Sequence, residues 1–440
     1  MLKILIHLAA YLFALLALCG LGYLGLSLWS EWRFLRRRAL GRRDVGRRAA
    51  GEFTPGVSIL KPLRGGDRQM YESFRSHCLQ DYPQYEIIFG VNQASDEAVA
   101  EVERLQREFP EHEIRLIVCS EGQNTAPLKP TEGLNGPPAD QDASRGANRK
   151  VSNLVQMMRA AKYGHIVIND SDIRVERDYL RRVVAPMEDA PKQGGDGPTD
   201  GSAAGTRQQT PLRLQAPVGL VTALYRAEAG GSIASRMEAI TIATDFAGGV
   251  LCAVELEGGL HFGLGSTLAF PRAAAEAIGG LETLVDYLAD DHELGRMIWE
   301  AGYEVVLCDA VVETFLPEYS FGAMFEHQLR WARTVRDLRK RGYIGVLLTF
   351  GLPWAMAAAL CAGGAGWSLV LLGAVTVARF ASGYVLCGPI LGDRQTMRDL
   401  WLIPARDVVG VAIWFASFGG DTIVWRGERF HLKDGRLTRA

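Results

Sequence analysis

Positive and negative charges almost cancel in this sequence, which therefore lacks an excess of either sign. Its 48 lysines and arginines face 50 aspartates and glutamates, which gives a formal net charge of −2. A nucleic-acid partner therefore has no overall electrostatic support. The chain also lacks a paired Cys-x-x-Cys spacing and an internal repeat, and its seven cysteines are scattered over 440 residues. Such an odd, dispersed set argues against a disulfide framework and against a structural zinc site.

Apolar residues are abundant, at 48% of the total, and they gather near the two ends of the chain. Residues 4–29 form a nearly unbroken apolar run that is long enough to cross a hydrocarbon core of about 30 Å. A secretory signal peptide is the alternative, but the run is long for such a peptide and no small-residue cleavage pattern follows it. We therefore predict an uncleaved transmembrane anchor over residues 1–32.

Arginines crowd the segment that follows this anchor, residues 33–54. Because basic flanks of membrane spans stay in the cytoplasm, we expect this basic linker and the domain after it to be cytoplasmic. The sequence thus predicts an integral protein of the inner (cytoplasmic) membrane, in contact with the lipid bilayer.

A second apolar region covers residues 342–425. Two spans are predicted in it, at 343–364 and 367–391, and they would form a helical hairpin that returns to the cytoplasm. The last apolar stretch, 408–425, contains an aspartate and a glycine pair, and the tail at 426–440 is basic. A full crossing would place this tail outside, against the charge rule, so a re-entrant or interfacial segment is favoured.

The central region, residues 55–341, alternates short β-branched runs with amphipathic helical patterns. This alternation predicts an α/β domain with βαβ units and a largely parallel, helix-covered sheet. Ligands of such sheets bind at the carboxyl ends of the strands. Two polar stretches with glycine and proline, 121–143 and 188–214, are predicted to be mobile surface loops.

Two aspartates, Asp170 and Asp172, directly follow the apolar strand predicted at 165–168. Carboxylates two residues apart at a strand end form a compact set of hard oxygen ligands. Mg²⁺ or Mn²⁺ typically binds one or two carboxylates together with substrate phosphates. A solvated turn is the alternative, but the position at the end of a strand favours a metal site.

A second group of acids lies at a predicted helix start, where Asp290 and Asp291 precede a helical pattern. Acidic residues at such a position also suit the helix dipole and can cap the helix. Capping accounts for one acid but not for the density of carboxylates here. A carboxylate in an apolar cleft can take a proton from an acceptor hydroxyl, so a general base is the other interpretation.

A basic helix is predicted shortly before the second apolar region, and it carries His327, Arg330, Trp331 and Arg333. Arginine side chains suit phosphates, and an aromatic face suits a base or a sugar ring. Contact with anionic lipid is an equally natural role beside a membrane. Lys150, at another predicted helix start, could likewise meet a phosphate or simply be solvated.

Taken in order, these features resemble the membrane glycosyltransferases of the family 2 type, and most of all the ceramide glucosyltransferase family, glycosyltransferase family 21. The similarity covers about residues 55–336 and the flanking anchors. The motifs that carry it are Ser58–Gly65 (SILKPLRG), Asp81–Pro83 (DYP), Lys150–Asn153 (KVSN), Asp170–Val175 (DSDIRV), the pair Asp290–Asp291, and Arg330–Trp331.

The resemblance implies a GT-A fold, a UDP-sugar donor, a divalent metal (Mg²⁺ or Mn²⁺) and inversion at the sugar carbon. By this similarity Asp291 would be the catalytic base. The other implied roles are the metal-diphosphate site for Asp170 and Asp172, and donor binding for Lys150, Asp290, Arg330 and Trp331. The chain departs from the family where an acid usually follows the second strand; Asp96 is the nearest candidate for that donor contact. It also departs at His327, where the family often has Gln or Arg.

The insertions and the alanine-rich composition resemble a bacterial branch associated with hopanoid biosynthesis, which implies N-acetylglucosamine and a polyhydroxylated hopanoid. Glucose and ceramide are the alternative that the wider family implies, and the residues do not decide between them. A processive polysaccharide synthase shares several motifs but needs more crossing helices than the three predicted with most support. A non-enzymatic membrane scaffold would leave the acids without a shared purpose. We therefore predict a hexosyltransferase that acts on a membrane lipid.

Overall fold

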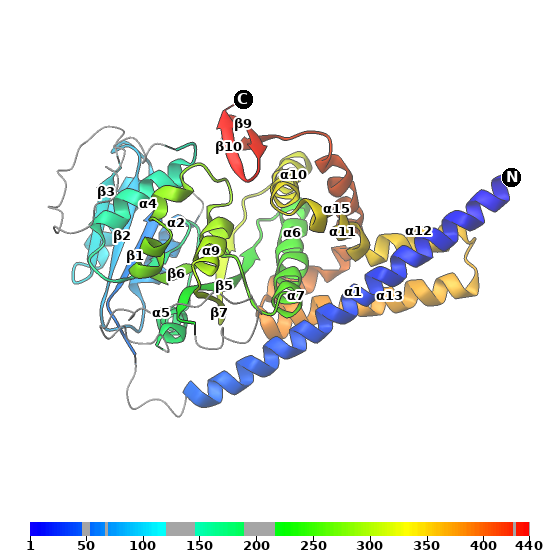
Figure 1. The fold of residues 1–440 in the computed structure, drawn as a ribbon, viewed down its shortest axis with the longest axis horizontal. Helices are drawn as coiled ribbons and strands as arrows, with labels where there is room; N and C mark the ends of the chain where they lie inside the picture. Colours follow the sequence, from blue (N-terminus) through cyan, green and yellow to red (C-terminus); the bar gives the residue numbers. More distant parts are fainter. Residues whose placement is uncertain (46–52, 67–68, 120–145, 189–215, 426–427, 440) are drawn as a thin grey trace, which may run out of the picture.

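The computed structural model describes residues 1–45, 53–66, 69–119, 146–188, 216–425 and 428–439 (Figure 1). Its centre is a seven-stranded sheet of order β3-β2-β1-β4-β6-β5-β7. The strands are β1 (Val57–Pro62), β2 (Tyr85–Val91), β3 (Glu113–Val118), β4 (His165–Ile168), β5 (Val218–Glu228), β6 (Leu268–Pro271) and β7 (Glu304–Phe315). Only β6 runs antiparallel to its neighbours. The predicted α/β class is confirmed.

Helices cover both faces of this sheet, which explains why β1, β2 and β4 are buried along almost their whole length. Neighbouring strand residues alternate between two buried clusters, as Ile59 and Leu60 of β1 do. One cluster contains α2 (Met70–Cys78), α3 (Ala98–Glu108) and α5 (Tyr179–Val184). The other contains α4 (Arg149–Ala160), α8 (Arg272–Ala277) and α9 (Asp290–Glu300). This alternation fixes which strand residues can reach a site at either face.

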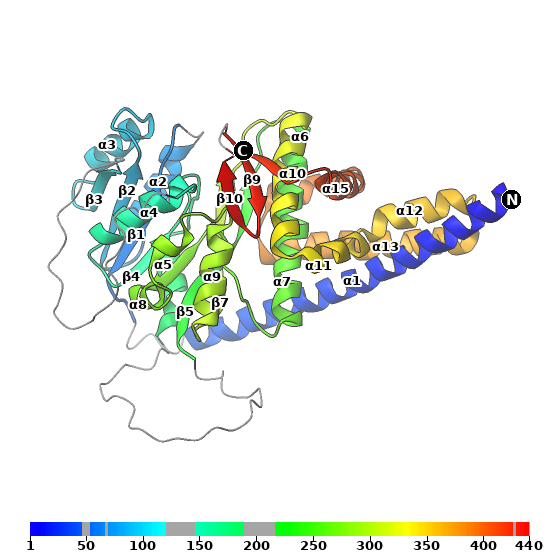
Figure 2. The ribbon, with the colours of Figure 1, turned by 45° about the horizontal axis from the view of Figure 1, so that its top comes forward.

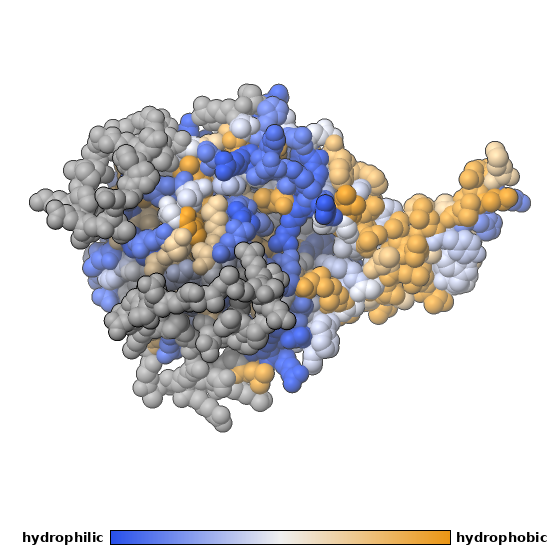
Figure 3. Space-filling view, in the orientation of Figure 1, coloured by the Kyte–Doolittle hydropathy of each residue, from blue (hydrophilic) through white to orange (hydrophobic). Residues whose placement is uncertain are grey.

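Long apolar helices form a rod at one side of the sheet domain. Helix α1 (Leu2–Val45) lies beside α12 (Gly351–Cys361) and α13 (Gly366–Val385) (Figure 1, Figure 2). Gly20 of α1 meets Gly351 so closely that a Cβ on Gly20 would be 2.3 Å from the Gly351 Cα atom. Small residues at such contacts let membrane helices approach each other. Apolar surface gathers over these helices (Figure 3).

Within the described residues, four helices are long and apolar enough to cross a membrane, or five if one bent pair counts as a span. The helix α1 continues to Val45, into the first part of the segment expected to be a separate linker. The predicted span at 343–364 is broken instead, with α11 (Lys340–Gly345) and a short 3₁₀ turn preceding α12 at a bend of 52°. The region 233–256, not foreseen as a span, is one of the four: α6 (Ile233–Ile240), a π-helical turn and α7 (Ala247–Leu256).

The end of the chain also differs from the expectation. The apolar stretch 408–425 is not one segment, because α15 (Ile403–Ser417) ends before the glycine pair and β8 (Thr422–Trp425) follows. The tail, expected only to be basic, contains two strands, β9 (Glu428–Lys433) and β10 (Arg436–Arg439). They join β8 in a three-stranded sheet. Another short helix, α14 (Arg394–Asp399), precedes α15. The predicted mobile loops lie outside the described residues, apart from Glu188.

Candidate active site

The first part of the candidate site is the end of β4. There Asn169 is fully buried, and its side-chain amide donates to the Tyr179 hydroxyl at 2.9 Å and to the Ser266 carbonyl at 2.7 Å. This anchoring fixes the backbone immediately before Asp170, whose own side chain is 41% exposed. A rigid strand end therefore presents Asp170 and the residues after it to the carboxyl edge of the sheet.

Lys150 joins two of the predicted acids. Asn148 caps α4 by accepting hydrogen bonds from the backbone N–H groups of Lys150 and Val151, as N-cap asparagines do. The Lys150 ammonium then lies 2.8 Å from Asp170 Oδ1 and 3.4 Å from Asp290 Oδ2. Burial alone would lower the pKa of Lys150, but the two carboxylates raise it above its ordinary value. Lys150 is therefore a permanent cation between the strand end and the α9 helix start.

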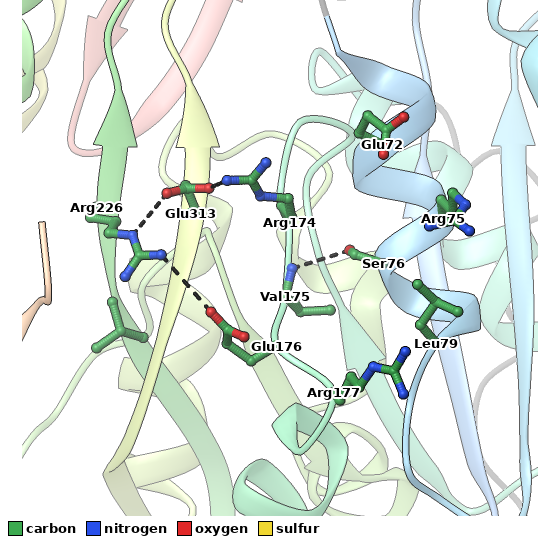
Figure 4. A pocket seen from close by; sticks show the side chains of 11 residues that line it. Glu72, Arg75, Ser76, Leu79, Arg174, Val175, Glu176, Arg177, Arg226 and Glu313 are labelled. Carbon is green, nitrogen blue, oxygen red and sulfur yellow. Dashed lines mark hydrogen bonds and ion pairs between the residues drawn. The ribbon is translucent and has the colours of Figure 1, made fainter. Parts of the chain in front are cut away.

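Asp172 is held from the other side by β7. The Thr314 hydroxyl donates to Asp172 Oδ2. The preceding residue of β7, Glu313, points to the opposite face of the sheet, as neighbouring strand residues do. There Glu313 accepts from Arg226 Nε at 2.8 Å and forms an ion pair with Arg174. These residues line a pocket of about 330 Å³ behind the site (Figure 4). The ion pairs tie the segment after Asp172 to the two strands that flank it.

Asp291 faces the same region from the start of α9. A Cβ added to Gly265 would be 2.9 Å from Asp291 Oδ2 and 3.8 Å from Asp170 Oδ2, so both carboxylates lie against this one glycine. Burial, and then the neighbouring Asp290 carboxylate, raise the pKa of Asp291 to about 6. Asp290 itself points away, toward Asn148 and Lys150. The adjacent acids thus have different surroundings.

Helix capping does not explain why Asp290 and Asp291 stand at the start of α9. The N-cap position of α9 is occupied by Ala289, whose methyl side chain cannot accept a hydrogen bond, and both aspartates lie within the first turn. Favourable interaction with the helix dipole remains. The helix dipole gives no reason for the half-buried Asp291 side chain to lie next to Asp170.

Two residues of this region were not singled out from the sequence as site residues. Lys61, at the end of β1, is 0% exposed and donates to the Asp170 carbonyl at 2.9 Å. Burial lowers the pKa of Lys61 to about 7, although Asp172 and Asp170 oppose this change. Tyr225, near the end of β5, is half-buried, and its pKa is raised by burial and then by the charge of Asp291.

Tyr225 is the first of a row of aromatic rings that leads to the basic helix, α10 (Phe321–Leu338). Its ring lies 5.1 Å from Phe246, which lies 6.4 Å from Trp331. Trp331 also lies 5.2 Å from the ring of His327. An aromatic row therefore leads from the carboxylates toward the helix that carries the predicted Arg330–Trp331 pair.

Other predicted residues have structural partners. His327 Nδ1 lies 3.0 Å from the buried Glu238 carboxylate, and Arg333 donates to the Thr422 carbonyl at 2.5 Å. Arg330 lies beside Trp331 on α10. Asp96 lies near the end of β2, where its carboxylate accepts from the Gly65 backbone N–H at 3.0 Å. It therefore holds the loop after β1 at the same edge of the sheet as the acids.

The carboxylate ligands at the end of β4 suit a hard cation, but they are too few to complete its coordination without further ligands. Among the residues that the structure describes, no group of three or more His, Cys, Asp and Glu side chains could hold a metal ion. Asp170 and Asp172 supply two carboxylates, and Mg²⁺ commonly binds through one or two carboxylates and the phosphates of a substrate. The residues present therefore fit a metal that arrives with, or is completed by, a diphosphate.

The sequence of this chain was compared with models of known protein families and with characterised proteins, and one family model matches most of its length. The sequence model described as "Glycosyl transferase family 21" matches residues 12–127, 139–195 and 208–438. Ceramide glucosyltransferase 3 of Caenorhabditis elegans is 22% identical over 396 residues, which are 87% of this chain and 73% of the relative. Ceramide glucosyltransferase of Komagataella phaffii is 33% identical over 129 residues, 29% of this chain and 22% of the relative.

Solved structures with a related arrangement were also found. A mannosyltransferase from Pyrobaculum calidifontis in complex with GDP-Man and Mn²⁺ aligns with a TM-score of 0.44 and 17% identity, over 92% of this chain and 99% of that one. Residues 1–349 of S. aureus TarS in complex with UDP-GlcNAc align with a TM-score of 0.33 and 11% identity, over 88% and 99%.

Proposed function

Because the chain belongs to glycosyltransferase family 21, we propose that it transfers a hexose from a UDP-sugar to a hydroxyl group of a membrane lipid. The membership confirms the family resemblance and, with the α/β sheet, the GT-A fold class with membrane helices at both ends. Glucose and N-acetylglucosamine are the candidate sugars, and ceramide and a polyhydroxylated hopanoid are the candidate acceptors. The observation that carries the proposal is the meeting of Asp170 and Asp291 at Gly265.

The donor diphosphate is assigned to the end of β4. Asp170 and Asp172 would hold Mg²⁺ or Mn²⁺, which when bound neutralises charge on a diphosphate leaving group. Lys150 adds a fixed positive charge beside Asp170, where it can contact a phosphate oxygen. Asp290 keeps that ammonium in place, and Arg330, Trp331 and Asp96 stay candidates for further donor contacts.

Asp291 is assigned the role of general base. A hydroxyl group is a poor nucleophile until a positioned carboxylate takes its proton. The raised pKa of Asp291 makes it a stronger base than an exposed aspartate, while it is still largely ionised at neutral pH. One such group is sufficient for a single displacement, and a single displacement inverts the configuration of the sugar carbon.

The acceptor is assigned to the membrane. Helix α10 leads from the aromatic row into α11, and the exposed apolar side chains of Ile344 on α11 and Leu348 in the turn before α12 come next. This continuity would let an amphiphile present its hydroxyl at the site while its apolar part stays in the bilayer. The arginines after the N-terminal anchor favour the cytoplasmic side of the inner membrane.

The choice of substrates is tested with the purified full chain, two donors and two lipids. UDP-glucose and UDP-N-acetylglucosamine are each combined with ceramide and with a polyhydroxylated hopanoid, and the products are analysed by mass spectrometry. We expect one sugar per lipid for a single preferred pair. A polymer of many sugars would instead support the alternative, a processive polysaccharide synthase.

The rate should depend on pH through Asp291. Its pKa is raised to about 6, so lowering the pH through 6 protonates the carboxylate and removes the base. We expect kcat/KM to be constant near neutral pH and to fall about tenfold per pH unit below about pH 6. The measurement is a pH profile of kcat/KM, with circular dichroism at each pH to show that the protein stays folded. A profile that is flat down to about pH 5 would exclude a base with this pKa.

A further inference from the structure

The C-terminal three-stranded sheet contacts the loop that leads into the two acids of α9. Tyr287 and Arg436 form an antiparallel bridge. On its two sides the Leu437 N–H donates to the Asp286 carbonyl at 2.8 Å, and the Leu288 N–H donates to the Gly435 carbonyl at 3.1 Å. In Figure 1 this hairpin lies between the sheet domain and α10. The tail is thus paired with the backbone immediately before Asp290.

Side chains reinforce this pairing. The guanidinium of Arg436 lies 5.2 Å from the centre of the Tyr287 ring and donates to its hydroxyl at 3.3 Å. Leu288 is buried in an apolar cluster that otherwise belongs to the tail, with Ile423, Phe430, Leu432 and Leu437. A small sheet needs a hydrophobic face to be stable in water, and Leu288 supplies part of that face here. Its apolar core therefore depends on the loop that it contacts.

The same loop supports the helix start that carries Lys150. The Asn148 N–H donates to the Val285 carbonyl at 2.8 Å. The Asn148 side chain donates to the Tyr287 carbonyl at 2.8 Å and to Asp290 Oδ1 at 3.3 Å. A displacement of Tyr287 would therefore shift Asn148 and Asp290. It would also shift Lys150, which lies between Asp290 and Asp170.

The C-terminal sheet is also tied to α10 and to the first residue of α11. The Gly435 N–H donates to Asp337 Oδ2 at 2.6 Å, and Lys340 pairs with Asp434 at 2.9 Å. Arg333 binds the Thr422 carbonyl at the first strand. The tail therefore bridges the helix that enters the membrane region and the loop that precedes the acids.

We propose that the C-terminal sheet, residues 422–425 and 428–439, is a clasp that positions Asp290 and Asp291 for sugar transfer, with Arg436 and Tyr287 as its positioning residues. This inference rests on the proposed function, because Asp291 is placed there as the base. The clasp does not touch substrate. When Tyr287 and Arg436 are paired, the clasp holds the Asp286–Leu288 loop in place. The enzyme with this pairing formed is the one that transfers sugar.

The first test compares two single substitutions in the hairpin. Arg436→Ala removes the contact with Tyr287, whereas Lys433→Ala removes the same charge from an exposed side chain on the adjoining strand. We expect Arg436→Ala to lower kcat about tenfold while the KM for the lipid stays within about twofold, since misplacement of a positioned group acts on rate. Arg436→Lys should recover most of the loss, and Lys433→Ala should match the unaltered protein.

A disulfide lock tests whether the paired state is the active one. Tyr287 and Arg436 form a pair flanked by two hydrogen bonds, the antiparallel type with a Cα separation of about 4.5 Å, which lies within the disulfide range. The Tyr287→Cys/Arg436→Cys protein should keep most of its activity when oxidised and fall to the Arg436→Ala level when reduced. The unaltered chain, with its seven cysteines, receives the same treatment as a control.

The outcomes separate the two proposals. If the unaltered chain transfers no sugar to any lipid, the proposed function fails. If it is active and Arg436→Ala is equally active, the clasp is excluded. A locked protein that is inactive until reduced would show that the hairpin must release the loop, which also contradicts the clasp. Failure of the disulfide to form, or rapid hydrogen exchange at the Leu288 amide, would contradict the pairing itself, independently of activity.

Discussion

Replacing Asp291 with asparagine is expected to slow sugar transfer by about 10²- to 10⁴-fold, the usual contribution of a positioned general base. The asparagine keeps the size of the side chain and can still accept the hydrogen bond from the His292 N–H, but it cannot take a proton. We expect a folded protein that still binds UDP. The measurements are single-turnover rates and a UDP titration on the full chain in detergent or lipid nanodiscs.

The controls come from the same helix. Glu300→Gln makes the same chemical change on an exposed side chain of α9 and should leave the rate nearly unchanged. Asp290→Asn weakens the hold on Lys150 and should raise the KM for the donor more than it lowers kcat. Near-normal turnover of Asp291→Asn together with an inactive Asp290→Asn would show that the other carboxylate is the base.

Replacing Asp172 with asparagine is the second change expected to have a large effect. The amide can still accept the hydrogen bond from Thr314, so the fold of the strand end should persist, but one of only two carboxylates available to a cation is lost. Because losing an outer partner of a metal ligand already costs about 10- to 100-fold, we expect the rate to fall by about 100-fold or more. Titration with Mg²⁺ and with Mn²⁺ should show weaker activation.

A matched control for this substitution is Asp178→Asn, at an exposed acid before α5, which should retain normal activity. Excess chelator should abolish transfer by the unaltered protein, and added Mg²⁺ or Mn²⁺ should restore it. Full turnover in the presence of chelator would contradict a metal-dependent donor site.

The first four strands of the central domain could be predicted because they are short apolar runs with β-branched residues, and β1, β2 and β4 are buried along almost their whole length. The strands β5, β6 and β7 were not predicted individually. The sites of Asp170 and Asp291 could also be found, since acids at a strand end or a helix start stand out against apolar neighbours. The positions of Lys61 and Tyr225 near these acids could not be predicted in the same way. The contact of Lys61 with Asp170 joins segments about 110 residues apart, and no local sequence pattern records such a contact.

The membrane and C-terminal segments show a second limit of sequence patterns. The region 233–256 is long and apolar enough for a membrane span, but it lies within the central α/β region and was assigned to that domain; 56% of its most apolar window is buried within the protein. The C-terminal sheet was hidden because the alternating apolar residues of β9, such as Phe430 and Leu432, lie among basic ones. Its partner, Leu288, is remote in sequence, so the tail was expected to be only basic.

The most direct test of lipid glycosylation by this site is the fate of the sugar. Membranes that carry either the unaltered chain or Asp291→Asn are given radiolabelled UDP-glucose or UDP-N-acetylglucosamine and then extracted with organic solvent. The account predicts label in the lipid extract of the unaltered chain, as a product with one sugar per lipid, and at least about 100-fold less with Asp291→Asn. Label found only in water-soluble glycan, or an equal yield of glycolipid from both membranes, would contradict it.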